Sequence, residues 1–338
     1  MNKPPLVSII INNHNYARYV GDATKSALGQ TYRPVEVIVV DDGSTDDSRA
    51  VIRGYAGQVI PVFQPAAGQA AAFNSGLARS GGEVVIFLDA DDALCPGLAA
   101  EVVAVFQADP HTAKVHYRLA VIDAQGQPTG AMMPAWHKPL PSGDLLSHLR
   151  QFSDDIAWQP TSGNAFSASV LRRFFPVPEH EYGLCADYYL SNLAPLFGPV
   201  RALEGVGGFY RVHGANRHHA TTMNLERTRT IIEQTCHTHR HLARVAAALG
   251  LRGFLTDSTA VPALSFLAHR LVSVRLDPAR HPIAADTAWS LGRRGMWAAW
   301  GRFDLSWLAR AIRAAWFAAA LVAPRPAVGW LAQRFFYP

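Results

Sequence analysis

The first hundred residues of the chain alternate between short apolar runs and longer segments with helical spacing. The runs, rich in β-branched residues, cover residues 6–11, 35–40 and 84–88. Parallel strands that are covered by helices on both faces read as continuous apolar runs of this kind. The pattern therefore predicts an α/β fold in which helices flank a mostly parallel central sheet.

Acidic clusters follow two of these runs, as DDGSTDD from Asp41 and DADD from Asp89. In an open α/β sheet, ligands bind beyond the carboxyl ends of the strands. The three carboxylates of DADD repel one another unless a cation lies between them, and Mg²⁺ or Mn²⁺ prefers oxygen ligands. The position and composition of DADD indicate a divalent-cation site. For either cluster, a solvated turn or a helix N-cap is the alternative.

Three phrases in order carry a family resemblance: SIIINNHNYARYV, VEVIVVDDGSTDDS and GQAAAFNSGLARSGGEVVIFLDADDALCPG. Together they resemble glycosyltransferase family 2, and a looser resemblance extends to YRVHGAN at residues 210–216. The resemblance implies a GT-A fold, which is Rossmann-like, and a nucleotide-diphosphate sugar donor that is UDP-linked. It also implies Mn²⁺ or Mg²⁺ as cofactor and transfer with inversion. The Gln-x-x-Arg-Trp phrase of processive members is absent, which favours addition of a single sugar.

The same resemblance assigns roles to residues at the carboxyl ends of the predicted strands. It implies that Asn12 contacts the nucleotide and that Asp42 accepts a hydrogen bond from the base. Asp91 becomes a direct metal ligand, and Asp89 a contact to the ribose or to the metal. The role of Asp92 is left open, and capping remains the alternative for Asp42.

Two departures from the family pattern accompany the next assignments. Where many members carry Arg before the Asn of the GQAAAFNSG segment, this chain has Phe73, so Gln69 and Asn74 are expected to compensate in binding the donor; helix shaping is the alternative for Asn74. Asp187 in CADYYL is the expected catalytic base, although Ala186 replaces the family's Glu before it. Without the resemblance, Asp187 reads as an N-cap.

The phrase YRVHGAN resembles the family's segment that closes over the donor. By resemblance, Arg211 holds the diphosphate, for which a planar guanidinium fork is well suited. His213 completes the metal shell, with a structural histidine as the equal alternative. An acceptor side, for which loop packing is the alternative, is expected at Trp158, Thr161, Ser162 and Asn164.

The pattern of segments divides the chain into two regions. Residues 1–218 are predicted to form the GT-A catalytic domain, with a nucleotide-sugar-binding half at about 1–110 and an acceptor half at about 111–218. Residues 219–338 are predicted to form a helical C-terminal region. Three widely spaced cysteines and a short apolar stretch at the N-terminus favour a reducing, cytoplasmic location.

The C-terminal region is basic and rich in tryptophan. Residues 265–338 contain ten Arg and three acidic residues, and six of the eight Trp lie in the last fifty residues. Only eleven uncharged residues separate Arg313 from Arg325, too few for the roughly twenty that span a bilayer. We expect either peripheral contact with the inner face of the cell membrane through amphipathic helices, or packing within a homo-oligomer.

Other function classes fit less well. No nucleic-acid-binding motif occurs, and no G-x-G-x-x-G follows the first strand as in dehydrogenases. The residues after that strand, NNHNYARYV, also lack the glycine-rich basic loop of nucleotidyltransferases. A non-catalytic scaffold that binds a nucleotide sugar is the remaining alternative, because fold alone does not establish activity.

Overall fold

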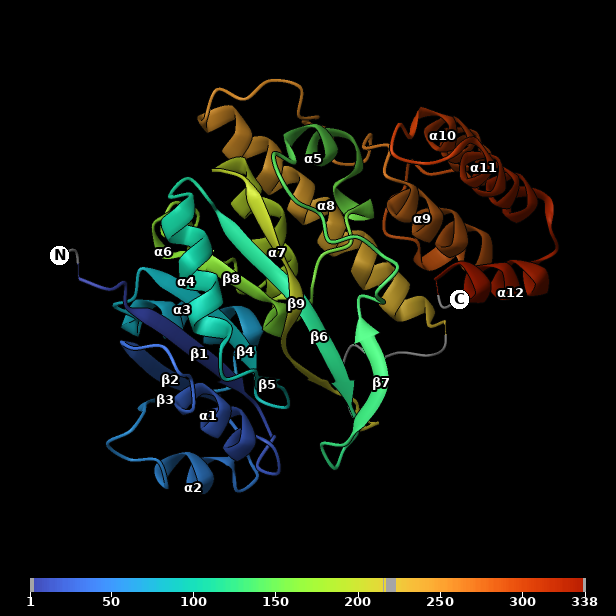
Figure 1. Ribbon diagram of the computed structural model, residues 1–338. Helices are drawn as coiled ribbons and strands as arrows, with labels where there is room; N and C mark the ends of the chain where they lie inside the picture. Colours follow the sequence, from blue (N-terminus) through green and yellow to red (C-terminus); the bar gives the residue numbers. More distant parts are fainter. Residues whose placement is uncertain (1–2, 215, 217–222, 337–338) are drawn as a thin grey trace. The chain divides into compact units, whose positions relative to one another are not determined.

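The computed structural model describes residues 3–214, 216 and 223–336 (Figure 1). The chain divides into two compact units. The sheet unit contains Met1–Leu146 and Ala157–Ala215, and the helical unit contains Ser147–Ile156 and Asn216–Pro338. The segment 147–156 therefore belongs with the C-terminal residues, although in sequence it lies inside the region predicted as catalytic.

One mixed sheet forms the centre of the sheet unit. Its strands are β1 (Val7–Asn13), β2 (Val35–Asp42), β3 (Ile60–Gln64), β4 (Val84–Asp89), β5 (Ala93–Leu94), β6 (Lys114–Ile122), β7 (Pro128–Met133), β8 (Asn164–Ser167) and β9 (Val200–Arg211). They run in the order β3-β2-β1-β4-β8-β6-β9-β5, and β7 pairs with β6. Helical segments of this unit are α1 (Val20–Leu28), α2 (Ser48–Arg53), α3 (Gln69–Arg79), α4 (Leu98–Ala108), η2 (Thr161–Gly163), α6 (Ala168–Leu171), α7 (Ala186–Leu193) and η3 (Ala194–Leu196).

The predicted parallel sheet is correct for its first part. β1, β2, β3 and β4 all pair in parallel, whereas β8 runs antiparallel to both β4 and β6. Parallel pairing needs a crossover that returns the chain to the starting edge. β8 instead begins at the carboxyl end of β4, where Ser162 just before it contacts the backbone of Asp89. The sheet as a whole is therefore mixed rather than mostly parallel.

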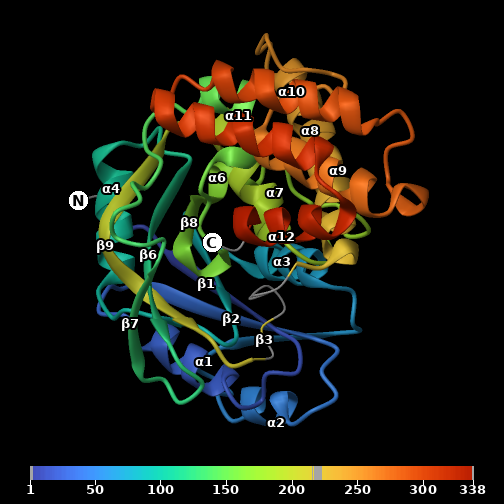
Figure 2. The same ribbon diagram turned by 90° about the vertical axis from the view of Figure 1, so that its right-hand side faces the viewer.

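Helices cover both faces of the strands β1 to β4 (Figures 1 and 2). Alternate residues of β1, Val7, Ile9 and Ile11, are fully buried in one core with residues of α1, α2 and α4. On the other face, α3 approaches β1 so closely at Gly76 that a Cβ atom there would lie 2.3 Å from Ile10 Cγ2. Two-sided burial explains the continuous apolar runs of these strands, and it fixes their carboxyl ends along one edge.

β6 carries a buried basic row on one face. Lys114, His116 and Arg118 alternate with core residues and are at most 2% exposed. The Lys114 Nζ donates to Ser191 Oγ at 2.9 Å and lies 4.2 Å from the Trp158 ring centroid. His116 Nε2 lies 2.6 Å from the Pro141 carbonyl oxygen. Burial, and next the neighbouring Lys114, lowers the pKa of His116 from 6.5 to about 3.

This buried histidine should make the protein sensitive to acid. Below pH 6.5 the histidine of the unfolded chain takes up a proton, whereas folded His116 stays neutral down to about pH 3. The free energy of unfolding therefore decreases as the pH falls from 6.5 to about 3. The loss amounts to about 1 kcal/mol per pH unit for one proton. His116→Gln should flatten the decline in urea-unfolding free energy between pH 7 and pH 5.5. An unchanged slope in the variant would show that other groups cause any acid sensitivity.

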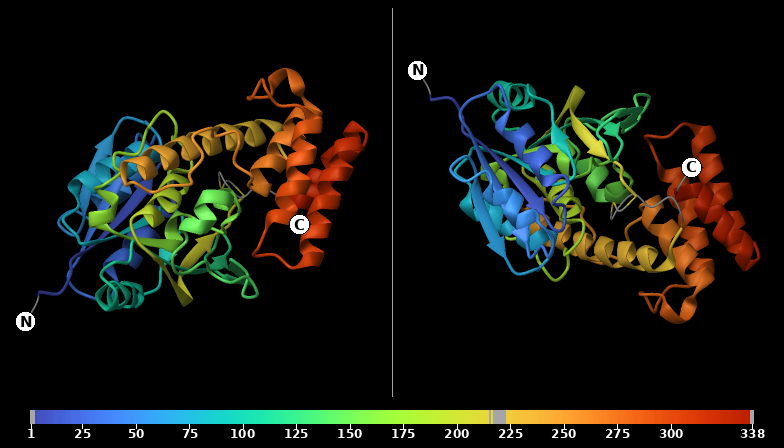
Figure 3. Two further views of the ribbon diagram at one scale, coloured as in Figure 1. Left: turned by 90° about the horizontal axis from the view of Figure 1, so that it is seen from above. Right: turned by 90° about the horizontal axis from the view of Figure 1, so that it is seen from below.

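The helical unit contains α5 (Leu146–Phe152), η1 (Ser153–Asp155), α8 (Leu225–Ala248), α9 (Leu264–Leu276), η4 (Pro278–Arg280), α10 (Ala288–Gly301), α11 (Trp307–Val322) and α12 (Arg325–Phe336). α10 and α11 lie side by side (Figures 1 and 3). Their close approach depends on Gly295, where a Cβ would meet the Phe317 ring at 2.1 Å. Within the described residues, no helix is long and apolar enough to cross a membrane.

Candidate active site

The carboxyl ends of β1, β2 and β4 bring the predicted polar residues together. Register pairs Asn12 with Asp89 and Asn13 with Asp41. The Asn12 Nδ2 donates to Asp89 Oδ1 at 2.8 Å, and the Asn13 Nδ2 donates to Asp41 Oδ1 at 3.1 Å. Two amide–carboxylate pairs thus connect the three strands at the edge where a ligand is expected.

Asp42, the predicted contact to the base, is 6% exposed and holds the loop after β3. Its Oδ1 accepts from Gln64 Nε2 and from the Ala67 amide, both at 2.8 Å, and its Oδ2 accepts from the Gly68 amide at 2.7 Å. A carboxylate has about four acceptor positions, so three of them serve the fold. These bonds set the backbone that leads directly into α3.

Gln69, the first residue of α3, bridges the two parts of the predicted site. Its Nε2 donates to Asp89 Oδ1 at 3.3 Å and to Thr161 Oγ1 at 3.2 Å. Its Oε1 accepts from the amide of Ala186 at 2.8 Å, at the start of the helix that carries Asp187. One side chain therefore connects the DADD turn to the predicted base.

The DADD turn is fastened by Asp92, whose role the sequence left open. Asp92 Oδ2 accepts from Ser162 Oγ at 2.6 Å, and Oδ1 accepts from the Arg211 amide at 2.9 Å. Ser162 Oγ in turn accepts from the Asp89 amide at 3.1 Å. Asp92 is 1% exposed, and burial, and next the charge of Asp91, raises its pKa well above the ordinary value. Its contacts fix the turn and leave Asp91 to face His213.

Asp91 and His213, both predicted as metal ligands, lie together. His213 Nε2 is 3.1 Å from Asp91 Oδ2. The histidine ring packs against Tyr19 and Tyr16, with centroids 4.8 and 5.6 Å away. These aromatic contacts orient the imidazole toward the carboxylate, so Arg211 and His213 both lie at the DADD turn.

The surroundings of the turn also raise the pKa of Asp89. Burial, then Asp91 and to a smaller degree Asp187, raises the pKa of Asp89 to about 7, against the opposing hydrogen bond from Asn12. Such a pocket of carboxylates favours a cation as a partner. Among the described residues, however, no three His, Cys, Asp or Glu side chains gather closely enough to hold a metal ion by themselves.

Arg211, predicted to hold a diphosphate, is 4% exposed at the end of β9. Its Nε donates to the Asp91 carbonyl oxygen at 2.8 Å, and its Nη2 lies 3.4 Å from Asp22 Oδ2. The guanidinium carbon lies 4.9 Å from the Tyr19 ring centroid. The structure thus brings Arg211 to the DADD turn, where it also braces the backbone.

Asp187 is the second residue of α7, and its Oδ1 accepts from the Tyr188 amide at 2.9 Å. The preceding Cys185 adopts a left-handed conformation with a φ of 60°, which turns the chain sharply into the helix. Asp187 lies close enough to act on the pKa of both Asp89 and Tyr210. It is therefore a further carboxylate near the DADD turn, carried by a different element.

Asn74 is a predicted donor-binding residue that the described contacts do not bring to this cluster. Its Nδ2 donates to the Val177 carbonyl at 2.9 Å and to Glu179 Oε1 at 3.1 Å, while its Oδ1 accepts from the Val177 amide at 2.8 Å. The side chain thus joins α3 to the segment after α6. These contacts agree with the structural alternative raised from the sequence.

Sequence reasoning missed several residues that support the site. Tyr16 and Tyr19 orient His213, and Lys114 supports α7 through Ser191. The alternation of basic and apolar residues from Lys114 to Leu119 was the available signal for a strand with a polar buried face. No comparable signal marks the tyrosines, because their contacts join segments nearly two hundred residues apart.

Comparisons with known proteins agree with this arrangement. The family model of Glycosyl transferase family 2 matches residues 8–177. An uncharacterized glycosyltransferase of Nostoc sp. is 38% identical over 216 residues, covering 63% of this chain and 66% of that protein. A chondroitin synthase of Escherichia coli is 32% identical over 176 residues, covering 50% of this chain and 25% of the relative. The chain thus spans less than two thirds of the length of these relatives.

Solved structures share the fold. TarS of S. aureus, residues 1–349 in complex with UDP, aligns with a TM-score of 0.52 at 16% identity, covering 95% of this chain and 91% of that one. Mannosyltransferase PcManGT from Pyrobaculum calidifontis, in complex with GDP-Man and Mn²⁺, aligns with a TM-score of 0.51 at 19% identity, covering 99% and 87%. The fold is the GT-A fold of glycosyltransferases, followed by a helical C-terminal region. The chain belongs to glycosyl transferase family 2.

Proposed function

We propose that this protein transfers a single sugar, with inversion, from a UDP-linked sugar to a hydroxyl group of a glycan or lipid-linked acceptor. The observation that carries the proposal is the bridge of Gln69 between two carboxylate sites, Asp89 in the DADD turn and the helix start of Asp187. Inversion needs a base on the face opposite the leaving diphosphate. A carboxylate separate from the donor site satisfies that need.

The donor side of the proposal includes Mn²⁺ or Mg²⁺. Asp91, Asp89 and His213 offer oxygen and imidazole ligands, and the donor's diphosphate supplies the ligands that the side chains lack. When bound, the ion neutralises charge that develops on the diphosphate. The Mn²⁺ bound by PcManGT supports this assignment by analogy of fold.

Nucleotide choice rests on residues at the ends of β1 and β2. In the proposed complex Asn12 contacts the nucleotide, and Asp42 uses its remaining acceptor position for the imide N–H of uracil. Complexes of TarS with UDP and UDP-GlcNAc favour uridine, whereas PcManGT binds GDP-Man. A GDP-linked donor is therefore the comparison that the experiment must include.

Arg211 and Gln69 complete the proposed donor site. Arg211 already reaches the DADD turn, and its guanidinium fork suits the diphosphate. The proposed role of Asn74 in donor binding has weaker support, because its amide bonds to Val177 and Glu179. The name of the chondroitin synthase relative supports a role in glycan or polysaccharide biosynthesis.

We also propose that the helical unit makes peripheral contact with the inner face of the cell membrane. Large apolar side chains on α10 to α12 are exposed, among them Trp297 and Trp307, each 75% exposed. Trp and Arg together are typical of membrane interfaces. A second copy of the chain on the same surface is the competing proposal.

A panel of UDP- and GDP-sugars tests the proposed transfer. Thermal stability and donor hydrolysis are measured for each sugar with Mn²⁺, with Mg²⁺ and with a chelator. We expect one UDP-sugar to stabilise the protein only when a metal is present, and to be hydrolysed. If no nucleotide sugar stabilises the protein, the transferase proposal fails. Stabilisation without hydrolysis or transfer would favour the non-catalytic scaffold.

A further inference from the structure

A pocket of ≈ 510 Å³ lies in the helical unit, along one side of α10. Trp289, Arg293 and Trp297 line it at intervals of four residues, which places them on one face of the helix. The remaining lining includes Arg294 of α10 itself, together with Gln151 and Pro262 from neighbouring segments. None of these residues belongs to the carboxylate site of the sheet unit.

Arg293 is an available cation in this pocket. It is exposed, and it makes no hydrogen bond or ion pair with any residue that the structure describes. Arg294 beside it is engaged, since its Nη2 donates to the Thr259 carbonyl at 2.6 Å. The guanidinium of Arg293 thus keeps its donors for a ligand, and a planar fork of donors matches a phosphate or a carboxylate.

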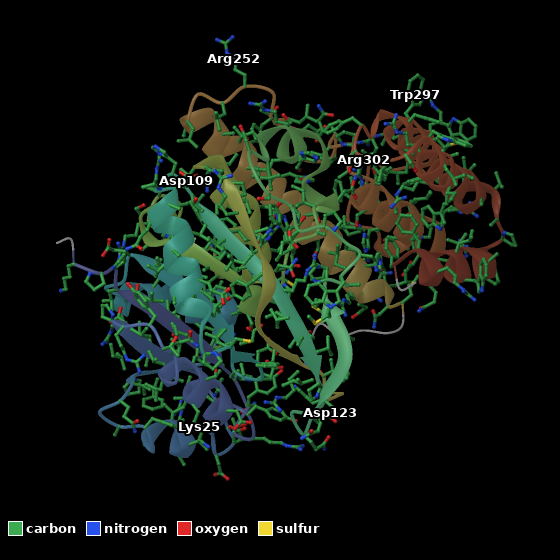
Figure 4. The ribbon with its side chains drawn as sticks, in the orientation of Figure 1. Lys25, Asp109, Asp123, Arg252, Trp297 and Arg302 are labelled. Atoms are coloured by element: carbon green, nitrogen blue, oxygen red, sulfur yellow. The ribbon has the colours of Figure 1, made fainter. Side chains whose placement is uncertain are left out.

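The two tryptophans that flank Arg293 are themselves open to solvent. Trp289 is 63% and Trp297 75% exposed, and Figure 4 shows Trp297 projecting outward from α10. Indole rings favour the boundary between headgroups and acyl chains, where an apolar ring meets a polar layer. The pocket therefore presents a cation between two groups suited to a lipid surface.

Charge and apolar exposure across α10 and α11 favour a lipid over a glycan. From residue 288 to 322 there are five Arg and a single acidic residue, Asp304, which pairs with Arg302. α11 also exposes Leu308, at 54%, and Ile312, at 61%. Exposed aliphatic side chains pack well against acyl chains, but they offer a sugar chain no hydrogen-bond donor or acceptor.

We propose that the pocket between Trp289 and Trp297 binds the phosphate of an anionic phospholipid headgroup through Arg293. The inference rests on the proposed membrane contact and adds a specific binding site to it. Diffuse electrostatic attraction holds the basic surface near the bilayer, and Arg293 binds one headgroup. Diffuse attraction contributes about fivefold in affinity for each basic residue near an anionic surface. A fork-shaped bidentate contact adds to that and cannot be replaced by Lys.

Flotation with vesicles of phosphatidylglycerol and of phosphatidylcholine tests the proposal, using the full chain. We expect preference for phosphatidylglycerol, a loss of affinity of about tenfold or more in Arg293→Gln, and a loss of several-fold in Arg293→Lys. The matched control, Arg325→Gln, removes an exposed arginine of α12 and should reduce affinity by no more than the diffuse amount. Trp297→Ala should weaken binding to both kinds of vesicle.

Other outcomes separate the proposals. Two results would show that the attraction is only diffuse: Arg293→Lys binding vesicles like wild type, or Arg293→Gln binding them like Arg325→Gln. Either result would overturn the headgroup pocket and leave the membrane contact standing. If no vesicle binds, both fail. Binding of soluble heparin that depends on Arg293, without vesicle binding, would assign the pocket to an anionic glycan and overturn the lipid. Stabilisation by nucleotide sugars, measured on the same variants without vesicles, reports separately on the transferase proposal.

Discussion

Asp91→Asn should abolish sugar transfer while leaving the protein folded. Asp91 offers the carboxylate that faces His213 at 3.1 Å, and Asn keeps the side-chain shape but removes the charge. Loss of a group that stabilises developing charge lowers kcat by about 100- to 1000-fold, and loss of a metal ligand adds to this. We expect at least a 1000-fold loss of turnover and no metal-dependent stabilisation by the donor.

Donor hydrolysis and thermal shift with Mn²⁺ measure this effect. The matched control is Asp47→Asn, which makes the same chemical change at an exposed position just before α2. It should behave like wild type in both assays. If the turnover of Asp91→Asn is within tenfold of the wild-type value, Asp91 is not a required metal ligand, and Asp89 becomes the next candidate.

Asp187→Asn should separate chemistry from donor binding. The contact from the Tyr188 amide to Oδ1 at 2.9 Å is available to Asn as well, so the start of α7 should keep its conformation. Asn cannot accept the proton of the acceptor hydroxyl, and loss of a general base costs about 100- to 10,000-fold in rate. We expect such a loss in kcat, with donor-induced stabilisation unchanged.

The control for this variant is Asp144→Asn. Asp144 is exposed, and its Oδ1 accepts from the Leu146 amide at 2.9 Å, which reproduces the local contact of Asp187 away from the cluster. It should leave kcat unchanged. If Asp187→Asn loses donor stabilisation together with turnover, Asp187 supports the donor site and another group must be the base. If it retains wild-type turnover, the inverting mechanism proposed here loses its base.

Much of the nucleotide-sugar-binding half was predictable from the sequence. The apolar runs predicted β1, β2 and β4, because a strand that is buried on both faces needs apolar residues along its whole length. The acidic clusters at their ends indicated the edge of the sheet that carries the site. The resemblance to glycosyltransferase family 2 gave the fold, and the comparisons confirm both the family and the fold.

The acceptor half was less predictable. β8 is only four residues long and antiparallel to β4, and its place depends on Ser162, whose hydroxyl bridges Asp89 and Asp92. The buried row of Lys114, His116 and Arg118 contradicts the usual exposure of basic residues. It is tolerated because hydroxyl, carbonyl and aromatic partners from other segments surround it.

By itself the sequence determined the strands β1, β2 and β4, the carboxylates at the ends of β2 and β4, and the basic, tryptophan-rich composition of the C-terminal region. These are local properties, set by the apolar pattern and the residue types within a short stretch of chain. Only the tertiary structure decided which residues meet: Gln69 with both Asp89 and Ala186, and Gln151 and Pro262 with the face of α10 that carries Arg293. The physical reason is that such contacts depend on backbone register, helix face and burial, which long-range packing fixes and no local pattern encodes.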